Sequence, residues 1–388
     1  MTMETKKNIF KEHLSSWLKA DKKGRGRIID MICAVASVHH KSVPRSFRRL
    51  QMRTSGGIEK RGRRKEYGPD VDAALKTVSE AASHPCGENL HALIPEYVRM
   101  LKRDGLWKHG EEATGKLLEM SVATAKRKAA VWKRFRSMMR GKSATRPGSI
   151  KAMIPVRSGP WDEAAAGTVQ IDTVAHCGDT LLGDFIYTVN AVDVRTLWSG
   201  RRAQWNKGQA QTIVSMDKID ANFFFPVLEW HPDSGSEFIN WSCKDWCERR
   251  GQKISRSRPS RKNDNCFVEE RNGHVVRRWI GYLRFDAPEL VEGINEVYDV
   301  LTPYLNHFAA SRRIIAKERF GAKWKIKREK ASLTPYERVM ARADISAEAK
   351  ERIMAEHERL NPLLLKREID RRINKLFLKY RRLSEPKS

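Results

Sequence analysis

Cysteine is scarce in this 388-residue chain, and its six cysteines form no recognisable framework. None stands in a C-x-x-C pair, and a chain of this length can build a core without disulfide staples. Cys243 and Cys247 are four residues apart, but no H-x-x-x-H motif completes a zinc site around them. We therefore expect free thiols.

Long apolar runs are also absent. No stretch approaches the roughly 18 apolar residues that a membrane span needs. The N-terminus has no apolar segment of signal-peptide length. These absences predict a soluble protein of the cytoplasm with no membrane partner. Apolar residues still make up 40% of the chain, enough for a sizeable core.

Acidic residues are few compared with basic ones, 47 against 75, which gives a net charge of +28. The excess is uneven: the net charge is +18 over 1–150, −2 over 151–310 and +12 over 311–388. Lysine and arginine gain affinity for nucleic acids by releasing phosphate counterions. A near-neutral centre between basic flanks favours a catalytic core with DNA-binding arms, although a merely soluble basic protein is the alternative.

Residues 25–53 have the pattern of a helix-turn-helix. Apolar residues recur at helical spacing before a polar turn at 38–41, and Ser42 and Pro44 favour the start of a second helix. An ordinary basic helical hairpin would show the same loose pattern. The residues that a recognition helix would present to a DNA groove are Arg45, Arg48 and Arg49.

A second helix-turn-helix candidate spans 112–136. Ser121 is a suitable N-cap for its second helix, which carries Lys126 and Arg127 as further candidates for DNA contact. Between 141 and 161, prolines and glycines lie among small and basic residues, which is typical of a linker.

The periodicity changes from helix to strand at residue 168. Val169 and Ile171 alternate with polar residues, and 185–194 and 196–204 predict two more strands of an antiparallel meander. The apolar run 223–228 predicts a strand covered on both faces. The other predicted elements are a helix at 212–221, a helix at 236–249, a strand at 253–257, and helices at 263–282 and 288–308. Together they describe a mixed α/β layer.

The chain becomes basic again after residue 310. The segment 320–328 alternates apolar and basic residues, which indicates either a strand or an extended arm that contacts DNA. Helices are expected near 347–357 and 362–380.

Three acidic residues stand out by their context. Asp172 lies in the first core strand, within VQIDTV (169–174), and Asp233 follows the apolar run, within WHPDSGSEF (230–238). Ligands of α/β sheets bind just beyond such strand ends. Glu269 lies on a predicted helix, within KNDNCFVEERN (262–272), where Asn265 and Asn272 share its stripe while Val268, Val275 and Trp279 pack inward. For an acid chosen at random, a plain surface position is the simpler interpretation.

Phosphoryl transfer explains why convergent carboxylates would be needed. Two divalent ions can stabilise the attacking and leaving oxygens of an in-line displacement. Mg²⁺ prefers carboxylate oxygens and retains several waters. Such chemistry requires no covalent nucleophile from the protein.

The order and spacing of these motifs resemble the integrase core of the DDE transposases, shared by retroviral integrases and bacterial insertion sequences. Asp233 and Glu269 are separated by 35 residues, and the D-x-G-x-E-F turn and N-D-N-x-x-V-E-x-x-N setting are present. The runs D-T-V-A-H-C-G at 172–178, R-S-R-P at 256–259 and K-N-D-N at 262–265 resemble insertion-sequence transposases in particular. The similarity extends over about 20–340. One departure is Ser234, where the family usually has asparagine.

The resemblance implies an α/β core of RNase H-like type, a mixed five-stranded sheet with flanking helices. All-α helix-turn-helix modules would precede it, and a basic, mainly helical tail would follow. The expected regions are a helix-turn-helix DNA-binding region (1–66), a second helical DNA-binding region (67–140), a linker (141–161), the integrase catalytic core (162–310) and a basic C-terminal region (311–388).

It also implies a function: metal-dependent cleavage and strand transfer of DNA by a bacterial mobile element. Asp172 would bridge two Mg²⁺ or Mn²⁺ ions, and Asp233 and Glu269 would each hold one. The expected partners are double-stranded DNA, as element ends and target, and further copies of the chain on that DNA. The supporting residues would be Asn265 and Asn272, and the phosphate contacts near the site Arg258, Lys262 and Arg271.

Other polar residues receive lesser roles. Asp193 matches a further family aspartate and is expected to support the fold, His176 and Cys177 are expected to be structural, and Glu270 is expected to face solvent. Two rival functions remain open: a DNA-binding regulator derived from a transposase, and a nuclease of the same fold that cuts without joining.

Overall fold

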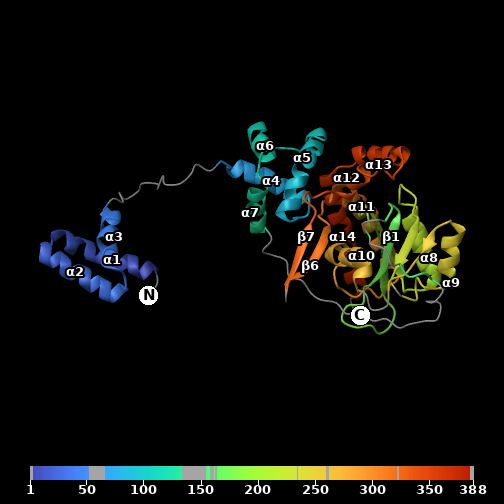
Figure 1. Ribbon diagram of the computed structural model, residues 1–388, viewed down its shortest axis with the longest axis horizontal. Helices are drawn as coiled ribbons and strands as arrows, with labels where there is room; N and C mark the ends of the chain where they lie inside the picture. The colour runs from blue at the N-terminus through green and yellow to red at the C-terminus, as the bar shows by residue number, and fades with distance from the viewer. Residues whose placement is uncertain are drawn as a thin grey trace. The chain divides into compact units, whose positions relative to one another are not determined.

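The computed structural model describes residues 3–51, 66–132, 154–157, 161, 164–233, 235–258, 262–320 and 323–384. The chain divides into two compact units, Met1–Glu66 and Tyr67–Ser388 (Figure 1). The ranges 67–140, 162–310 and 311–388, expected as separate regions, therefore lie together in the second unit. Most of the expected linker 141–161 falls outside the described residues. Among those described, no helix is long and apolar enough to cross a membrane.

The described residues of the first unit form three helices: α1 (Met3–Lys19), α2 (Lys22–Ala36) and α3 (Ser42–Gln51). Asp21 caps α2 by accepting a hydrogen bond from the Gly24 N–H at 2.8 Å. α3 buries Val43 and Phe47 in a small core and leaves its arginines exposed. α2, its following turn and α3 occupy the range in which the sequence predicts a helix-turn-helix.

The second unit begins with four helices, α4 (Pro69–Ala81), α5 (Gly87–Arg103), α6 (Glu111–Leu118) and α7 (Val122–Trp132). Ser121 caps α7 as expected, since its Oγ accepts from the Thr124 N–H at 3.3 Å. Gly87 permits the close approach of α5 and α7, because a Cβ there would lie 2.4 Å from the Lys126 Cα.

The centre of this unit is a mixed five-stranded sheet with the order β3-β2-β1-β4-β5. Its strands are β1 (Thr168–Ala175), β2 (Ile186–Asp193), β3 (Ser199–Trp205), β4 (Glu229–Pro232) and β5 (Lys253–Ile254). β1, β2 and β3 form the expected antiparallel meander, whereas β4 pairs with β1 in parallel and β5 with β4 in parallel. The sheet and its flanking helices fit the RNase H-like fold.

Helices cover both faces of the sheet (Figure 1). α8 (Gln209–Asp220) and α9 (Trp241–Arg249) lie on the face to which Val169 and Ile171 point, and they share an apolar core with it. α10 (Cys266–Arg271) and α11 (Leu290–Phe308) lie on the opposite face, the one that carries Asp172.

The strand expected at 223–228 was placed wrongly. That run is a loop, and β4 begins only at Glu229, which pairs with Thr168. Phe223 and Phe225 meet edge to face at 5.6 Å and are buried beside α8. Buried loop aromatics therefore imitate the apolar signature of a buried strand.

The helix expected at 236–249 starts later, at Trp241. Asn240 caps it by accepting from the Cys243 N–H at 2.9 Å, and a turn occupies the preceding residues. The helix expected at 263–282 is divided into a 3₁₀ turn (Lys262–Asn265), α10 and a π-helical segment (Asn272–Arg277). The wider π turn shifts the inward positions by one residue, so Ile280 is fully buried and Trp279 only partly.

The C-terminal part contains a hairpin of β6 (Ile314–Phe320) and β7 (Lys323–Arg328). The alternation at 320–328 is thus a strand in part. The tail then forms α12 (Pro335–Met340), α13 (Ala347–Arg359) and α14 (Pro362–Ser384), and α14 packs along α11.

Candidate active site

Asp172 and Asp233 are brought together by the pairing of two parallel strands. β1 and β4 pair Ile171 with Pro232, and each of these residues is followed by an aspartate, Asp172 within β1 and Asp233 just beyond the end of β4. Burial first, and then the negative charge of Asp233, raise the pKa of Asp172 to about 7. Two of the three carboxylates expected at the site are therefore electrostatic neighbours.

Glu269 is exposed on α10, and this helix lies directly against Asp172. Asn272, one turn after Glu269, donates from Nδ2 to Asp172 Oδ2 at 2.7 Å. Asn190 on β2 donates in turn to Asn272 Oδ1 at 2.9 Å. Asp172 Oδ1 accepts from the Thr173 N–H at 2.8 Å. Both oxygens of Asp172 are thus oriented by the protein.

The donor set fits a hard divalent cation. Carboxylates that raise one another's pKa release that repulsion when a cation binds between them. In the part of the chain that the structure describes, no three His, Cys, Asp or Glu side chains gather closely enough to hold a metal ion. Mg²⁺ is often held by only one or two carboxylates together with waters and substrate phosphates.

Glu237 is a further carboxylate beside the site, which the sequence assigned only to the turn after Asp233. It is 5% exposed, accepts from Thr173 Oγ1 at 2.8 Å and lies 3.9 Å from Lys207 Nζ. Its charge also contributes to the raised pKa of Asp172. The signal that could have identified Glu237 is its position in the D-x-G-x-E-F turn, where a charged residue alternates with Asp233 and Gly235.

Gly235 holds this turn together. Its N–H donates to Asp233 Oδ1 at 2.7 Å. A Cβ at this position would lie 2.8 Å from Glu237 Oε2 and 2.9 Å from Asp233 Oδ1. Any side chain here would displace one of the two carboxylates. Ser234, the departure from the family pattern, lies outside the described residues.

The remaining supporting residues differ in their surroundings. Asn265 is buried at the start of α10, and neither polar atom of its side chain has a hydrogen-bond partner among the described residues. Asp193 accepts from the N–H groups of Gly167 and Thr196 and holds the β2–β3 turn. His176 bonds Thr188 Oγ1 at 2.8 Å, and burial lowers its pKa to about 3, so the ring stays neutral.

The arginines and lysines expected to contact DNA occupy several environments. The three on α3 are exposed, as is Arg127 on α7, whereas Lys126 pairs with Glu88 at 2.7 Å. Arg258 forms a two-pronged ion pair with Asp264, at 2.8 and 2.9 Å. Arg271 is partly buried, and burial lowers its pKa. The Lys262 side chain lies outside the description.

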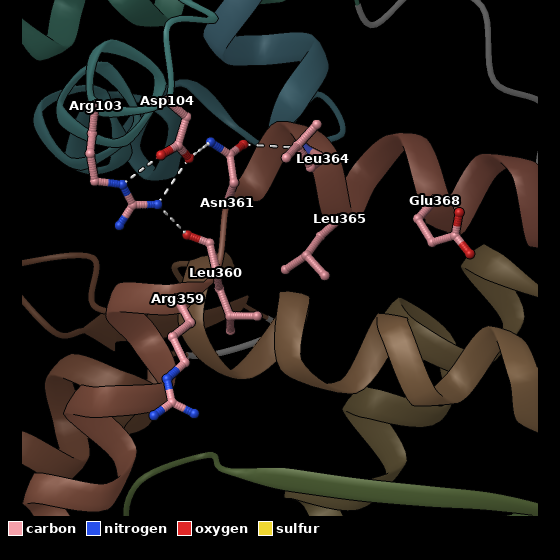
Figure 2. A pocket seen from close by; sticks show the side chains of 8 residues that line it. All are labelled: Arg103, Asp104, Arg359, Leu360, Asn361, Leu364, Leu365 and Glu368. Atoms are coloured by element: carbon pink, nitrogen blue, oxygen red, sulfur yellow. Dashed lines mark hydrogen bonds and ion pairs between the residues drawn. The ribbon is translucent and has the colours of Figure 1, made fainter.

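A pocket of about 450 Å³ lies elsewhere, between the end of α5 and the start of α14 (Figure 2). Arg103 donates there to Asp104 at 2.7 Å and to the Leu360 carbonyl at 2.9 Å. Asn361 donates to the same aspartate. These groups are hydrogen-bonded to one another across the junction of α5 and α14, which is typical of a structural contact.

A curated relative covers most of the chain. The uncharacterized protein y4rM of Sinorhizobium fredii (strain NBRC 101917 / NGR234) is 30% identical over 327 residues, which are 83% of this chain and 92% of the relative. The chain belongs to the y4rM family. Membership of the y4rM family brings no activity with it, because y4rM itself is uncharacterized. No protein-family model matches the chain.

Two solved structures are similar in part. The catalytic core domain of BIV integrase is 15% identical, with 30% of this chain and 70% of that chain covered and a TM-score of 0.25. A simian T-cell lymphotropic virus intasome in complex with PP2A regulatory subunit B56 gamma is 13% identical, with 54% and 69% covered and a TM-score of 0.30. At such scores the RNase H-like assignment of this y4rM-family chain rests on its strand order and layers.

Proposed function

We propose that the chain is a DNA transposase or integrase of the DDE type, which cleaves and joins DNA strands of a mobile element. The observation that carries the proposal is the juxtaposition of Asp172 on β1 with Asp233 just beyond the end of β4, the parallel neighbour of β1. Asn272, which directly follows the helix of Glu269, donates a hydrogen bond to Asp172. An acidic cluster opposite a hydrogen-bonded helix, between basic flanks, suits phosphodiester chemistry.

Asp172, Asp233 and Glu269 would hold two Mg²⁺ or Mn²⁺ ions. When bound, such ions activate a water or a 3′-hydroxyl and stabilise the charge of an in-line phosphoryl transfer. The Thr173 N–H and Asn272 fix the two oxygens of Asp172 before any ion arrives. This preorganisation lowers the cost of assembling the site on DNA.

Double-stranded DNA, as element ends and target, is the proposed substrate. α3 and α7 are the proposed DNA-reading helices, because each lies where the sequence predicts the second helix of a helix-turn-helix and each presents exposed basic side chains. Joining two element ends to one target requires more than one active site, so the chain is proposed to assemble as a homo-oligomer on DNA.

The test is a gel assay with the element's terminal sequences, a labelled target duplex and Mg²⁺ or Mn²⁺. Asp172→Asn, Asp233→Asn and Glu269→Gln should each lower cleavage and joining by at least about 10³-fold, since each removes an anionic ligand. DNA binding should change little. Glu270→Gln, one residue from Glu269 and exposed, is the matched control and should remain active.

The rival functions give different outcomes. Cleavage without joined products would identify a nuclease. Duplex binding with neither reaction in the parent chain would identify a regulator. An active Glu269→Gln together with an inactive Glu270→Gln would show that the third carboxylate had been assigned to the wrong residue.

A further inference from the structure

Gln170 occupies a central position between β1 and α10. It lies on β1 two residues before Asp172, so both side chains point to the face that α10 covers. The residue is 0% exposed. A fully buried amide must find its partners within the protein.

Those partners are all on the segment that carries Glu269. Gln170 Oε1 accepts from the N–H groups of Phe267 and Val268, at 3.0 and 3.2 Å. Its Nε2 donates to the Asp264 carbonyl at 2.9 Å. The first N–H groups of a helix lack partners within that helix. Gln170, which lies on strand β1, therefore caps the N-terminus of α10.

The residue at the usual capping position does not perform this role. Asn265 precedes α10, but its side chain makes no capping hydrogen bond. α10 is consequently tied to β1 by polar bonds at two places, through Gln170 at its start and through Asn272 to Asp172 at its end. Glu269 lies between these two attachments.

Apolar contacts alone would hold α10 less specifically. Val268 packs with Val192 and Leu197 in a small cluster, with Phe267 against it. Such contacts resist separation of the helix from the sheet, but they are non-directional and permit sliding along it. Hydrogen bonds to two consecutive N–H groups fix the position of the helix along β1.

We propose that Gln170 is a positioning residue that sets Glu269 against Asp172 by capping α10 from β1. The inference rests on the proposed function, because the placement of Glu269 has a chemical consequence only if both carboxylates act together. The capping itself can be measured whether or not the chain joins DNA.

The experiment compares three variants of the full-length chain. Gln170→Met keeps the approximate volume and deletes every hydrogen bond, whereas Gln170→Glu keeps the acceptor that faces the helix N-terminus. Gln204→Met is the matched control. Gln204 is also 0% exposed and makes three side-chain hydrogen bonds, but on β3 and to Asn206, Thr212 and Ser215.

Two readouts are needed. Hydrogen exchange of the Phe267 and Val268 amides should accelerate about tenfold in Gln170→Met, less in Gln170→Glu and not in Gln204→Met. The kcat for strand joining should fall roughly 10- to 100-fold in Gln170→Met with the KM for DNA within about twofold, and recover in part in Gln170→Glu. Gln204→Met should lower the Tm while its kcat stays near that of the parent.

Unchanged exchange of the two amides in Gln170→Met would overturn the capping role. An equal loss of kcat in Gln204→Met would overturn the positioning role, since general destabilisation would then explain it. If the parent joins no DNA, the proposed function fails and the positioning role fails with it, while the exchange data separately decide whether Gln170 caps α10.

Discussion

At the carboxylate site, a single side chain is subject to opposing requirements. Asp172 would have to be charged to hold the proposed cation, yet burial and the neighbouring Asp233 disfavour its charge. Charging Asp172 therefore lowers the stability of the fold, and the proposed cation would offset this loss. Such a trade of stability for function is common where charges converge.

Asp172→Asn should stabilise the metal-free chain at high pH. The folded pKa of about 7 lies above the ordinary aspartate value of 3.8, so the free-energy penalty of charging Asp172 is absent below pH 4, grows as pH rises and is complete above pH 7. The expected gain at pH 8 is on the order of 4 kcal/mol, because each unit between the two pKa values is worth about 1.4 kcal/mol. Thermal unfolding in chelator at pH 8 and pH 4 measures it, with the exposed Asp245→Asn as control. An equal gain at both pH values would contradict the electrostatic cause.

Gly235→Ala should disturb the site without a change of charge. The added methyl group would meet Glu237 Oε2 at 2.8 Å and Asp233 Oδ1 at 2.9 Å, so one carboxylate must move. In the parent, millimolar Mn²⁺ should raise the Tm, because binding adds about 2.7 kcal/mol of stability when the free ion is at 100 times its Kd. This rise in Tm should be smaller in Gly235→Ala. Gly273→Ala is the matched control, because a Cβ there meets nothing within 4 Å. An identical Mn²⁺ response in both variants would contradict the prediction.

At the scale of elements, one exposed helix face and one junction between helices are informative. One is the exposed basic face of α3, opposite the buried Val43 and Phe47. The other is a buried histidine pair where α11 meets α13. His307 Nδ1 and His357 Nδ1 are 3.2 Å apart, while the Nε2 atoms bond Glu356 at 3.0 Å and Glu96 at 2.8 Å.

The α3 face should account for much of the affinity for duplex DNA. Replacing Arg45, Arg48 and Arg49 by alanine should weaken binding and reduce the slope of log K against log salt by about 2 to 3. Replacing the exposed Lys7, Lys11 and Lys19 of α1 removes the same charge from another helix and should have a smaller effect. Fluorescence anisotropy at several salt concentrations measures both. Equal slopes for the two triple variants would count against a recognition role for α3.

The histidine pair should make the α11–α13 junction sensitive to acid. Both Nε2 atoms bond glutamates, so a proton added to His307 must be accommodated at the buried contact between the two Nδ1 atoms. Burial also lowers the pKa of His307, so the unfolded chain binds its proton first and stability is lost as pH falls below about 6.5.

His307→Gln should therefore reduce the dependence of Tm on pH between 7 and 5, and the exposed His274→Gln should leave it unchanged. Thermal scans at half-unit pH steps provide the comparison. A pH dependence in His307→Gln as steep as in the parent would assign the acid sensitivity to other groups.

At the scale of the whole molecule, the chain consists of two units, each with a core of its own. The first unit's cluster draws only on α1, α2, α3 and the turn between the last two, while the second unit's clusters extend from α4 to α14. Separate cores predict separate unfolding.

The truncated chain 67–388 should therefore fold and melt within about 2 °C of the upper transition of the full chain, because its core is retained. Affinity for terminal DNA should fall, since α3 is lost. Scanning calorimetry and anisotropy measure the two effects. A truncated chain that does not fold would show that the first unit stabilises the second.

The sequence by itself determined most element positions and pointed to the proposed chemistry. Alternation at Val169 and Ile171 identifies β1, and the order of acids around Asp233 and Glu269 indicates metal-dependent phosphoryl transfer. These signals are readable because each depends on residues close in the chain: a strand or helix face repeats every 2 or 3.6 residues.

Only the tertiary structure decided where β4 starts, where a π turn shifts the helix after α10, and which polar groups meet. Phe223 and Phe225 are buried in a loop outside the sheet, and Gln170 caps a helix almost a hundred residues away. Periodicity reports that a residue is buried, but it does not report the hydrogen-bond partner. That partner depends on which strand and which helix become neighbours, and this is settled only when the whole sheet assembles.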